Sequence, residues 1–207
     1  MNSHAIKSSY HHGDLSTTLL QAAMELIVED GVDGLSMRKL ADRVGVSRTA
    51  PYHHFKDKKA LLSALALQGF RDYSQQIDAV MSDPQLNPEQ QIQQFVRTYL
   101  RFALDNPQSY DLMFGQPVWK SGQPSEGLHT EAYRCFRSFV DQVEVWQKQG
   151  VLPASCEALR FTQVIWSTLH GLCRLVIDGV YVESDSIDVI GDTVLRLFRQ
   201  QLNNRPE

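Results

Sequence analysis

Residues 36–55 read SMRKLADRVGVSRTAPYHHF, and this stretch decides how the N-terminal part of the chain folds. It predicts two short helices joined by a tight turn. Ser36 can cap the first helix, and Gly45 can close it because glycine adopts the backbone angles of such a turn at little cost. Ser47 can then cap a second helix, which we expect to run to about residue 55. The pattern is that of a helix-turn-helix.

The second helix carries the side chains that indicate function. Pro51 removes one N–H near its start, so we expect the helix to continue with a slight bend. Its N-terminus directs free backbone N–H groups and a partial positive charge outward, which suits a phosphate. The inner sides of the two helices supply a small core from Leu40, Ala41, Val44, Val46 and Phe55, and the outer side exposes Arg48, Thr49, Ala50, Tyr52 and His53.

Positive charge is concentrated in the same region, although the whole chain of 207 residues has a formal net charge of −4. Residues 36–59 contain seven basic side chains against Asp42 and Asp57, a balance of +5, so the rest of the chain carries −9. The seven are Arg38, Lys39, Arg43, Arg48, Lys56, Lys58 and Lys59. A compact basic segment on an acidic body indicates a protein that meets a polyanion at one end only.

The rest of the chain also predicts helices, because apolar residues recur with a period near 3.6 and no stretch alternates with period 2. We expect an all-α fold of about nine helices, with a loop over residues 115–124. The expected helices span residues 14–31, 36–45, 47–55, 57–81, 88–106, 110–114, 125–149, 155–178 and 185–202.

Two runs of sequence together resemble the TetR family of bacterial regulators: TLLQAAMELIVEDG (residues 18–31) and LSMRKLADRVGVSRTAPYHHFKDKKALL (residues 35–62). The resemblance covers residues 12–72. It implies that Arg48, Thr49 and Ala50 face base edges in the major groove, that Tyr52, His53 and His54 hold the backbone or neighbouring bases, and that Lys58 pairs with a phosphate. The full predicted set of DNA-binding residues is Arg38, Ser47, Arg48, Thr49, Ala50, Tyr52, His53, His54 and Lys58.

The segment DPQLNP at residues 83–88 marks a change of domain. We therefore predict a helix-turn-helix DNA-binding domain over residues 12–72 and a helical regulatory and dimerisation domain over residues 84–203, joined by a long helix. Apolar faces on the last two long helices can pack within one chain or across a two-fold axis. The family resemblance favours a homodimer through residues 155–178 and 185–202, which would read a near-palindromic double-stranded DNA operator.

Aromatic and sulfur-containing residues gather in the middle of the second domain. They suit either a pocket for a small hydrophobic or aromatic effector or an ordinary helical core. The pocket candidates are Phe102, Tyr110, Met113, Phe114, Trp119, Phe139, Trp166 and His170. His170 lies in WSTLHG (residues 166–171), which is similar to a Trp-x-x-x-His-Gly element of one branch of TetR-like C-terminal domains, as is YHHGDL at residues 10–15. His170 can anchor a ligand or bond a group in the core.

Other classes of protein are less consistent with the sequence. There is no nucleophile elbow, phosphate loop or metal-spaced cluster, so we predict no catalytic residues, no metal, no cofactor and no enzyme activity. The polar N-terminus, the lack of a long apolar run and three widely spaced cysteines, predicted as small core residues, favour a cytoplasmic protein with no membrane partner. A ligand-responsive repressor is the leading hypothesis; the alternatives are an activator or ligand-independent regulator, and a small-molecule-binding protein with a vestigial DNA head.

Overall fold

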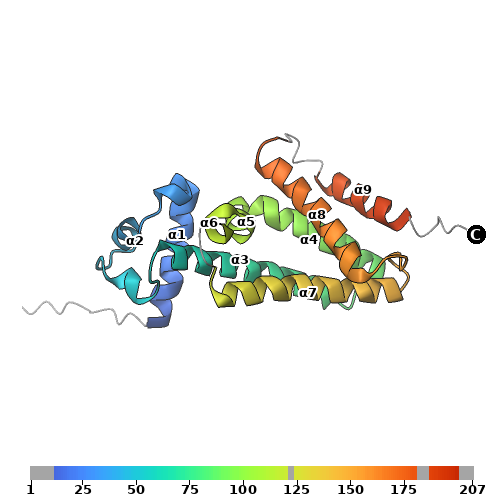
Figure 1. The fold of residues 1–207 in the computed structure, drawn as a ribbon, viewed down its shortest axis with the longest axis horizontal. Helices are drawn as coiled ribbons and strands as arrows, with labels where there is room; N and C mark the ends of the chain where they lie inside the picture. Colours follow the sequence, from blue (N-terminus) through green and yellow to red (C-terminus); the bar gives the residue numbers. More distant parts are fainter. Residues whose placement is uncertain (1–11, 121–123, 181–186, 201–207) are drawn as a thin grey trace, which may run out of the picture.

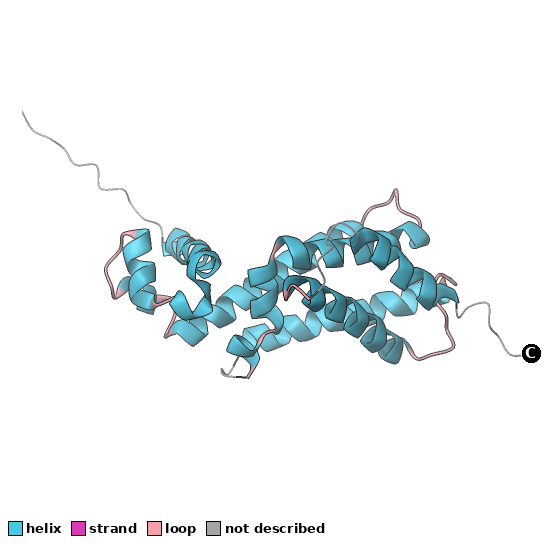
Figure 2. Cartoon of the chain, turned by 90° about the horizontal axis from the view of Figure 1, so that it is seen from above, coloured by secondary structure: helices cyan, strands magenta, loops and turns pink. Residues whose placement is uncertain are grey.

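The chain folds into helices throughout the residues that the computed structural model describes, 12–120, 124–180 and 187–200 (Figures 1 and 2). The prediction of an all-α fold is therefore confirmed. The elements are α1 (His12–Gly34), α2 (Met37–Val44), the 3₁₀ turn η1 (Ala50–His53), α3 (Lys58–Met81), α4 (Pro88–Asp105), α5 (Pro107–Phe114), α6 (Gln116–Trp119), α7 (Glu126–Lys148), α8 (Ala158–Ile177) and α9 (Ile187–Gln200).

The molecule is elongated, with a small head at one end and a larger helical body at the other (Figure 1). The head consists of α1, α2, η1 and the first turns of α3. Helix α3 then leaves the head and runs through the body, where α4, α5 and α7 all pack against it. One helix therefore belongs to both parts of the molecule.

The helix boundaries follow the capping residues in the sequence. Ser36 Oγ accepts a hydrogen bond from the Lys39 N–H at 3.2 Å, and Gly45 ends α2 in the left-handed conformation with φ 75°. Before α4, the Asn87 side chain accepts from the Gln90 N–H while the Gln90 side chain accepts from the Asn87 N–H, both at 3.0 Å. Such caps satisfy backbone groups that a helix end otherwise leaves unpaired, which is why they fix the ends of these helices.

The prediction of an α-helix from Ser47 to about residue 55 is wrong. The chain forms turns after Ser47 and then the short 3₁₀ turn η1. An α-helix starting there requires the N–H of residue 51 to bond the Ser47 carbonyl, and Pro51 has no N–H. The Ala50 N–H bonds that carbonyl instead, at 2.9 Å, and the Tyr52 N–H bonds the Thr49 carbonyl at 3.1 Å, so the i to i+3 pattern replaces the α pattern.

Smaller corrections concern the loop and the cysteines. The expected loop over residues 115–124 contains the short helix α6, and α1 continues through a kink at Gly31 to Gly34. Of the three cysteines predicted as core residues, Cys173 is buried and Cys135 partly buried, but Cys156 is exposed.

Pro88 and Pro107 stand at the starts of α4 and α5, where a missing N–H removes no helical bond.

A close approach of α5 to α3 depends on Gly69. A Cβ atom at this position would lie 2.6 Å from Ser109 Oγ and 2.9 Å from Met113 Sδ. We expect Gly69→Ala to lower the free energy of unfolding by about 1 kcal/mol, since overpacking costs about 1–3 kcal/mol and alanine returns up to ~1 kcal/mol of helix propensity. Chemical denaturation monitored by circular dichroism measures the change.

Gly127→Ala is the matched control, because its Cβ would make only an ordinary contact with Leu67 at 3.8 Å. We expect this variant to be as stable as the parent protein or slightly more stable. An equal gain in both variants would show that the α3–α5 contact has room for a methyl group.

Candidate DNA interface and internal pocket

The turn after α2 and the 3₁₀ turn η1 form an exposed surface at the end of the head. Arg48, Thr49, Tyr52 and His53 are all exposed there, and Ser47 Oγ lies 3.1 Å from Thr49 Oγ1. Tyr52 has 53% of its surface exposed, which leaves its ring available for contact with another molecule. The structure thus places most of the predicted DNA-binding side chains together on one short segment.

The remaining predicted residues flank this segment. Arg38 is exposed on α2, while Ala50 and His54 are partly buried, with the His54 ring centroid 6.3 Å from that of Phe55. Lys58 is partly buried at the N-terminus of α3, where Asp57 caps the helix by accepting from the Ala60 N–H at 2.8 Å. These positions surround the exposed turn from both sides.

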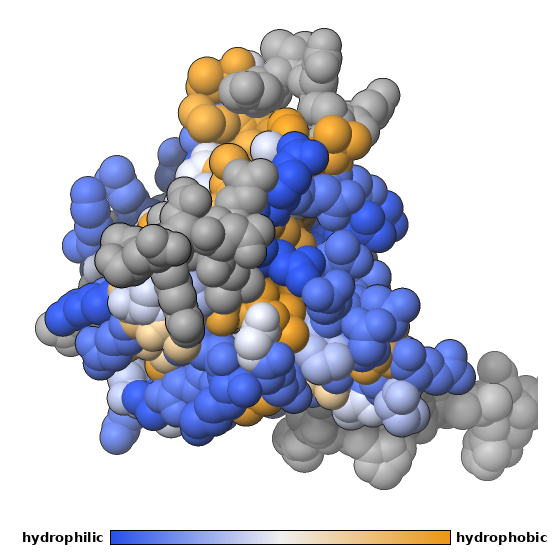
Figure 3. All heavy atoms as spheres, turned by 90° about the vertical axis from the view of Figure 1, so that its right-hand side faces the viewer, coloured by the Kyte–Doolittle hydropathy of each residue, from blue (hydrophilic) through white to orange (hydrophobic). Residues whose placement is uncertain are grey.

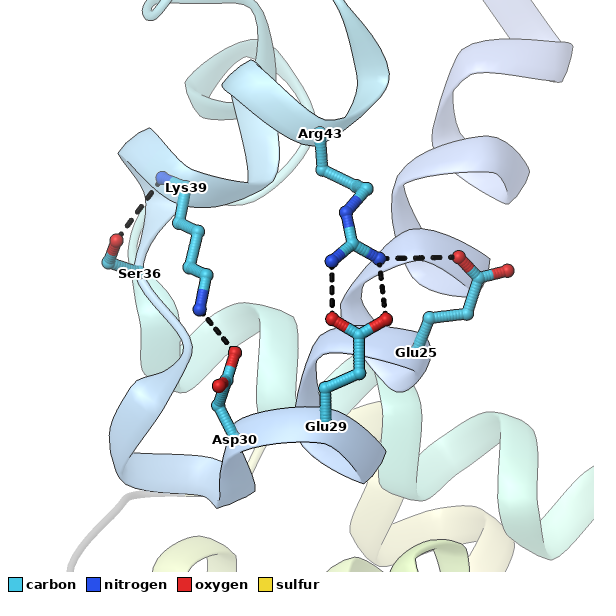
Figure 4. A network of polar contacts seen from close by, with 6 residues as sticks. All are labelled: Glu25, Glu29, Asp30, Ser36, Lys39 and Arg43. Atoms are coloured by element: carbon cyan, nitrogen blue, oxygen red, sulfur yellow. Dashed lines mark hydrogen bonds and ion pairs between the residues drawn. The ribbon is translucent and has the colours of Figure 1, made fainter.

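Two basic residues of the head are engaged within the protein, which the charge count could not reveal (Figure 4). Arg43 makes a two-pronged contact with Glu29, with Nη1 3.0 Å from Oε1, and also lies 3.8 Å from Glu25. Lys39 pairs with Asp30. The hydrogen bond from Arg43 lowers the pKa of Glu29 below its usual value, and Glu29 raises the pKa of Arg43. These pairs fasten α2 to α1.

Five basic residues of the head are left over. Within the described part of the chain no ion pair involves Arg38, Arg48, Lys56, Lys58 or Lys59. Acidic residues of α1 neutralise Lys39 and Arg43. The basic side chains without such a partner lie on α2, on the exposed turn and at the start of α3. A polyanion that approaches this face meets charge that the protein itself does not neutralise.

Comparison with known proteins gives two matches to family models. Residues 19–65 match the bacterial regulatory proteins of the tetR family, and residues 92–198, more than half of the chain, match the Tetracyclin repressor-like C-terminal domain. The chain belongs to the TetR family. This is a family of DNA-binding regulators and not of enzymes, which confirms the prediction that the chain is not an enzyme.

The curated relatives with the highest identities match only a short part of the chain. The class A tetracycline repressor protein of Escherichia coli is 57% identical over 49 residues, which cover 24% of this chain and 23% of that protein. The match therefore spans about a quarter of the length of such curated relatives. A structure of a protein with unknown function from Rhodococcus sp. RHA1 is 28% identical, covers 94% of this chain and 98% of that one, and has a TM-score of 0.82.

The TetR fold is also seen in a TetR family transcriptional regulator from Thermus thermophilus. That structure is 22% identical, covers 86% of this chain and 97% of the other, and has a TM-score of 0.67. Among the described residues, no helix has the combination of length and apolar character that crossing a membrane requires.

The TetR body contains a cavity of about 270 Å³ between α3, α4, α5, α6, α7 and α8. Four predicted pocket residues line it, namely Phe114, Trp119, Phe139 and Trp166. Trp119 is held in place by a hydrogen bond from its Nε1 to the Met113 carbonyl at 2.6 Å. The other lining residues are Phe70, Tyr73, Tyr99, Ala132, Cys135 and Phe136.

The lining residues that sequence reasoning missed sit mainly on α3 and α7, at helical spacing. Residues 132, 135, 136 and 139 form one face of α7, and Phe70 and Tyr73 lie one turn apart on α3. The spacing is visible in the sequence, but the same spacing describes an ordinary core face, so it does not by itself indicate a pocket.

The other predicted pocket residues lie behind the cavity. Phe102, Tyr110 and Met113 are buried in the core. His170 is partly buried, and its Nδ1 lies 2.6 Å from the Tyr110 hydroxyl, which lies 2.8 Å from the Tyr99 hydroxyl. Because Tyr99 lines the cavity, these bonds connect His170 to its wall.

The environment of His170 predicts a pH dependence of stability. Burial, and secondarily the charge of Arg174, lowers the pKa of His170 below its usual 6.5. The unfolded chain therefore binds the proton more readily, so stability is complete above about pH 6.5 and falls as the pH drops toward the lowered pKa. We expect the parent protein to lose more thermal stability than His170→Gln between about pH 7.5 and about pH 5.5. Equal losses in thermal melts would contradict this.

Proposed function

We propose that this protein is a homodimeric transcriptional repressor that binds a near-palindromic DNA operator and is released when a small hydrophobic or aromatic molecule enters the internal pocket. The observation that carries the proposal is the placement of two sites along α3. The exposed basic turn lies at one end of this helix, and the cavity includes Phe70 and Tyr73 from its middle. We take residues 12–72 as the DNA-binding domain and residues 84–203 as the regulatory domain.

The exposed turn supports a division of roles among the head residues. Arg48 can make a two-pronged contact with the O6 and N7 atoms of guanine, the commonest contact that reads sequence. Thr49 and Ala50 lie beside it and would meet base edges. Arg38, Ser47 and Lys58 would hold the sugar-phosphate backbone without reading sequence. Tyr52, His53 and His54 would hold the backbone or neighbouring bases.

Helices α8 and α9 support dimerisation because each is apolar on two sides. One stripe packs within the chain and buries Ile165, Leu169, Ile187 and Val194. A second stripe is exposed and contains Val164, Leu175, Val189 and Leu197, with Val164 56% exposed and Leu197 60% exposed. At the end of the molecule where these helices lie, hydrophobic surface is visible among hydrophilic surface (Figure 3). The sequence allowed two alternatives for these helices, packing within one chain or packing across a two-fold axis. The buried stripe serves the first, and we propose that the exposed stripe serves the second.

Gly171 also favours a helix from a second chain against α8. A Cβ atom at Gly171 would meet nothing within 4 Å, so no contact inside the protomer requires a glycine there. A second copy of α8 crossing at this point would use the missing side chain. Part of the predicted interface, residues 185–186 and 201–202, lies outside the described residues.

Binding of the operator tests the proposal directly. We would measure fluorescence anisotropy with duplexes from the DNA next to the gene, at several salt concentrations, against a duplex of scrambled sequence. The proposal expects sequence-selective binding that weakens steeply with salt, since phosphate contacts release counterions. Binding that does not distinguish the two duplexes would contradict it, and so would no binding at all. Selective binding of the operator would also exclude the alternative of a small-molecule-binding protein whose DNA-binding head is vestigial.

A further inference from the structure

Three polar side chains, Tyr99, Tyr110 and His170, form a chain of hydrogen bonds that begins at the wall of the cavity. Burial raises the pKa of the Tyr99 hydroxyl, and the nearby Trp166 indole N–H only partly opposes that rise. With His170 neutral and its ring proton on Nε2, the Tyr110 hydroxyl can donate to His170 Nδ1 at 2.6 Å, and the Tyr99 hydroxyl can then donate to the Tyr110 oxygen at 2.8 Å. Each hydroxyl proton in this chain therefore has an acceptor.

Tyr73 is not part of this chain of hydrogen bonds. It lines the cavity, and within the described part of the chain its hydroxyl makes no hydrogen bond. Its ring is fixed by edge contacts with Tyr99 and Phe102, at centroid distances of 5.7 and 5.4 Å. Burial raises the pKa of Tyr73 well above its usual value, so the hydroxyl stays neutral. Tyr73 is only partly buried, and a ligand with a hydrogen-bonding group would give its hydroxyl a partner.

The lining of the cavity contains no charged side chain. Eight of its ten residues are aromatic, and the other two are Ala132 and Cys135. Glu131, whose carboxylate lies 3.9 Å from Cys135 Sγ, is engaged by Arg134. Asp111, on α5 of the same body, is engaged by Arg174. A ligand with a full charge would lose hydration here and meet no side chain of opposite sign in this lining.

We propose that the pocket takes a neutral, planar aromatic molecule of one or two rings, with one hydroxyl or carbonyl group that bonds Tyr73. This rests on the proposed function of the pocket as an effector site. The size follows from the volume of about 270 Å³, since a dry cavity of roughly 150 Å³ already accepts benzene. The shape follows from the aromatic walls, which favour stacked or edge-on rings. Tyr73 is then the residue that selects the polar group.

Isothermal titration calorimetry with four probes that share the naphthalene ring system tests the chemistry of the ligand. The probes are 2-naphthol, naphthalene, 2-naphthoate and 2-naphthyltrimethylammonium. We expect 2-naphthol to bind most tightly, naphthalene about tenfold more weakly, and the two ions at least about a hundredfold more weakly than 2-naphthol. Tighter binding of either ion than of 2-naphthol would overturn the proposal, as would the absence of binding by both neutral probes.

The variant Tyr73→Phe tests the role of the hydroxyl while it keeps the ring. We expect its affinity for 2-naphthol to fall about tenfold, to the level of naphthalene, with naphthalene binding unchanged. Tyr133→Phe is the matched control, because Tyr133 is exposed on the outer side of α7. Equal weakening of both probes, or no weakening of either, would show that the hydroxyl does not select the ligand.

The calorimetry does not depend on DNA, so the two proposals fail in different ways. If 2-naphthol binds as expected but leaves operator binding unchanged, the ligand chemistry stands and the effector role does not. If operator binding is selective but the neutral probes do not bind, the regulator stands and the inference about the ligand fails.

Discussion

Replacing Val164 by glutamate is expected to convert the protein to monomers and to weaken operator binding about a hundred- to ten-thousandfold. Two linked heads bind a palindromic site with a combined affinity that exceeds that of one head by about this factor. Val164 is exposed on the second apolar stripe of α8, and near a two-fold axis each glutamate would face its own symmetry copy. Two carboxylates that lose water without a positive partner oppose association strongly.

Val145→Glu makes the same chemical change on α7 and serves as the control. Val145 is 42% exposed but lies on neither of the helices proposed to dimerise. Multi-angle light scattering should report a dimer for the parent protein and the control, and a monomer for Val164→Glu, which should keep its helical circular dichroism spectrum. A Val164→Glu protein that stays dimeric and binds the operator normally would move the interface away from this face.

Replacing Arg48 by alanine is expected to abolish discrimination at one base pair of each half-site. A two-pronged contact between arginine and guanine is worth ~1–3 kcal/mol of discrimination, or about 5- to 150-fold for each half-site. Arg48 is exposed on the turn before η1 and takes part in no ion pair in the described ranges, so its removal leaves no partner unpaired inside the protein. Anisotropy titrations with operator variants substituted at single positions measure the effect.

Lys58→Ala provides the comparison for Arg48→Ala. A contact with phosphate carries no sequence information, so this variant should weaken binding to every duplex by a similar factor and reduce the salt dependence. If instead Lys58→Ala changed the preferred sequence and Arg48→Ala weakened all duplexes alike, the two roles would be reversed.

Local signals in the sequence predict most of the helices, and the exceptions have identifiable causes. Capping residues such as Ser36, Asp57 and Asn87 fix helix starts because they satisfy backbone N–H groups within one turn of chain. Sequence reasoning treats Pro51 as the loss of one bond within an α-helix. In the structure the segment forms turns and the short 3₁₀ turn η1 instead of an α-helix, because so short a helix has few other bonds to hold it.

The candidate site is predicted less completely because it depends on contacts between distant segments. The count of basic residues could not show that Arg43 is engaged by Glu29, which is fourteen residues earlier on another helix. In the same way, Tyr110 and Phe114 lie one turn apart, yet only Phe114 reaches the cavity, while Tyr110 is buried behind it. Periodicity identifies the inward face of a helix but not where packing between helices leaves a space.

The length of α3 has a mechanical consequence. From Tyr73 in the cavity to Lys58 in the head the helix has fifteen steps, or about 22 Å at ~1.5 Å for each residue. A rotation of about 9° around the cavity end would move the head end by about 3.4 Å, which is the spacing of successive base pairs along one strand. If a ligand acts as proposed, the helix would serve as a lever arm, and a small rearrangement of the aromatic rings would shift the basic turn by the spacing of one base pair.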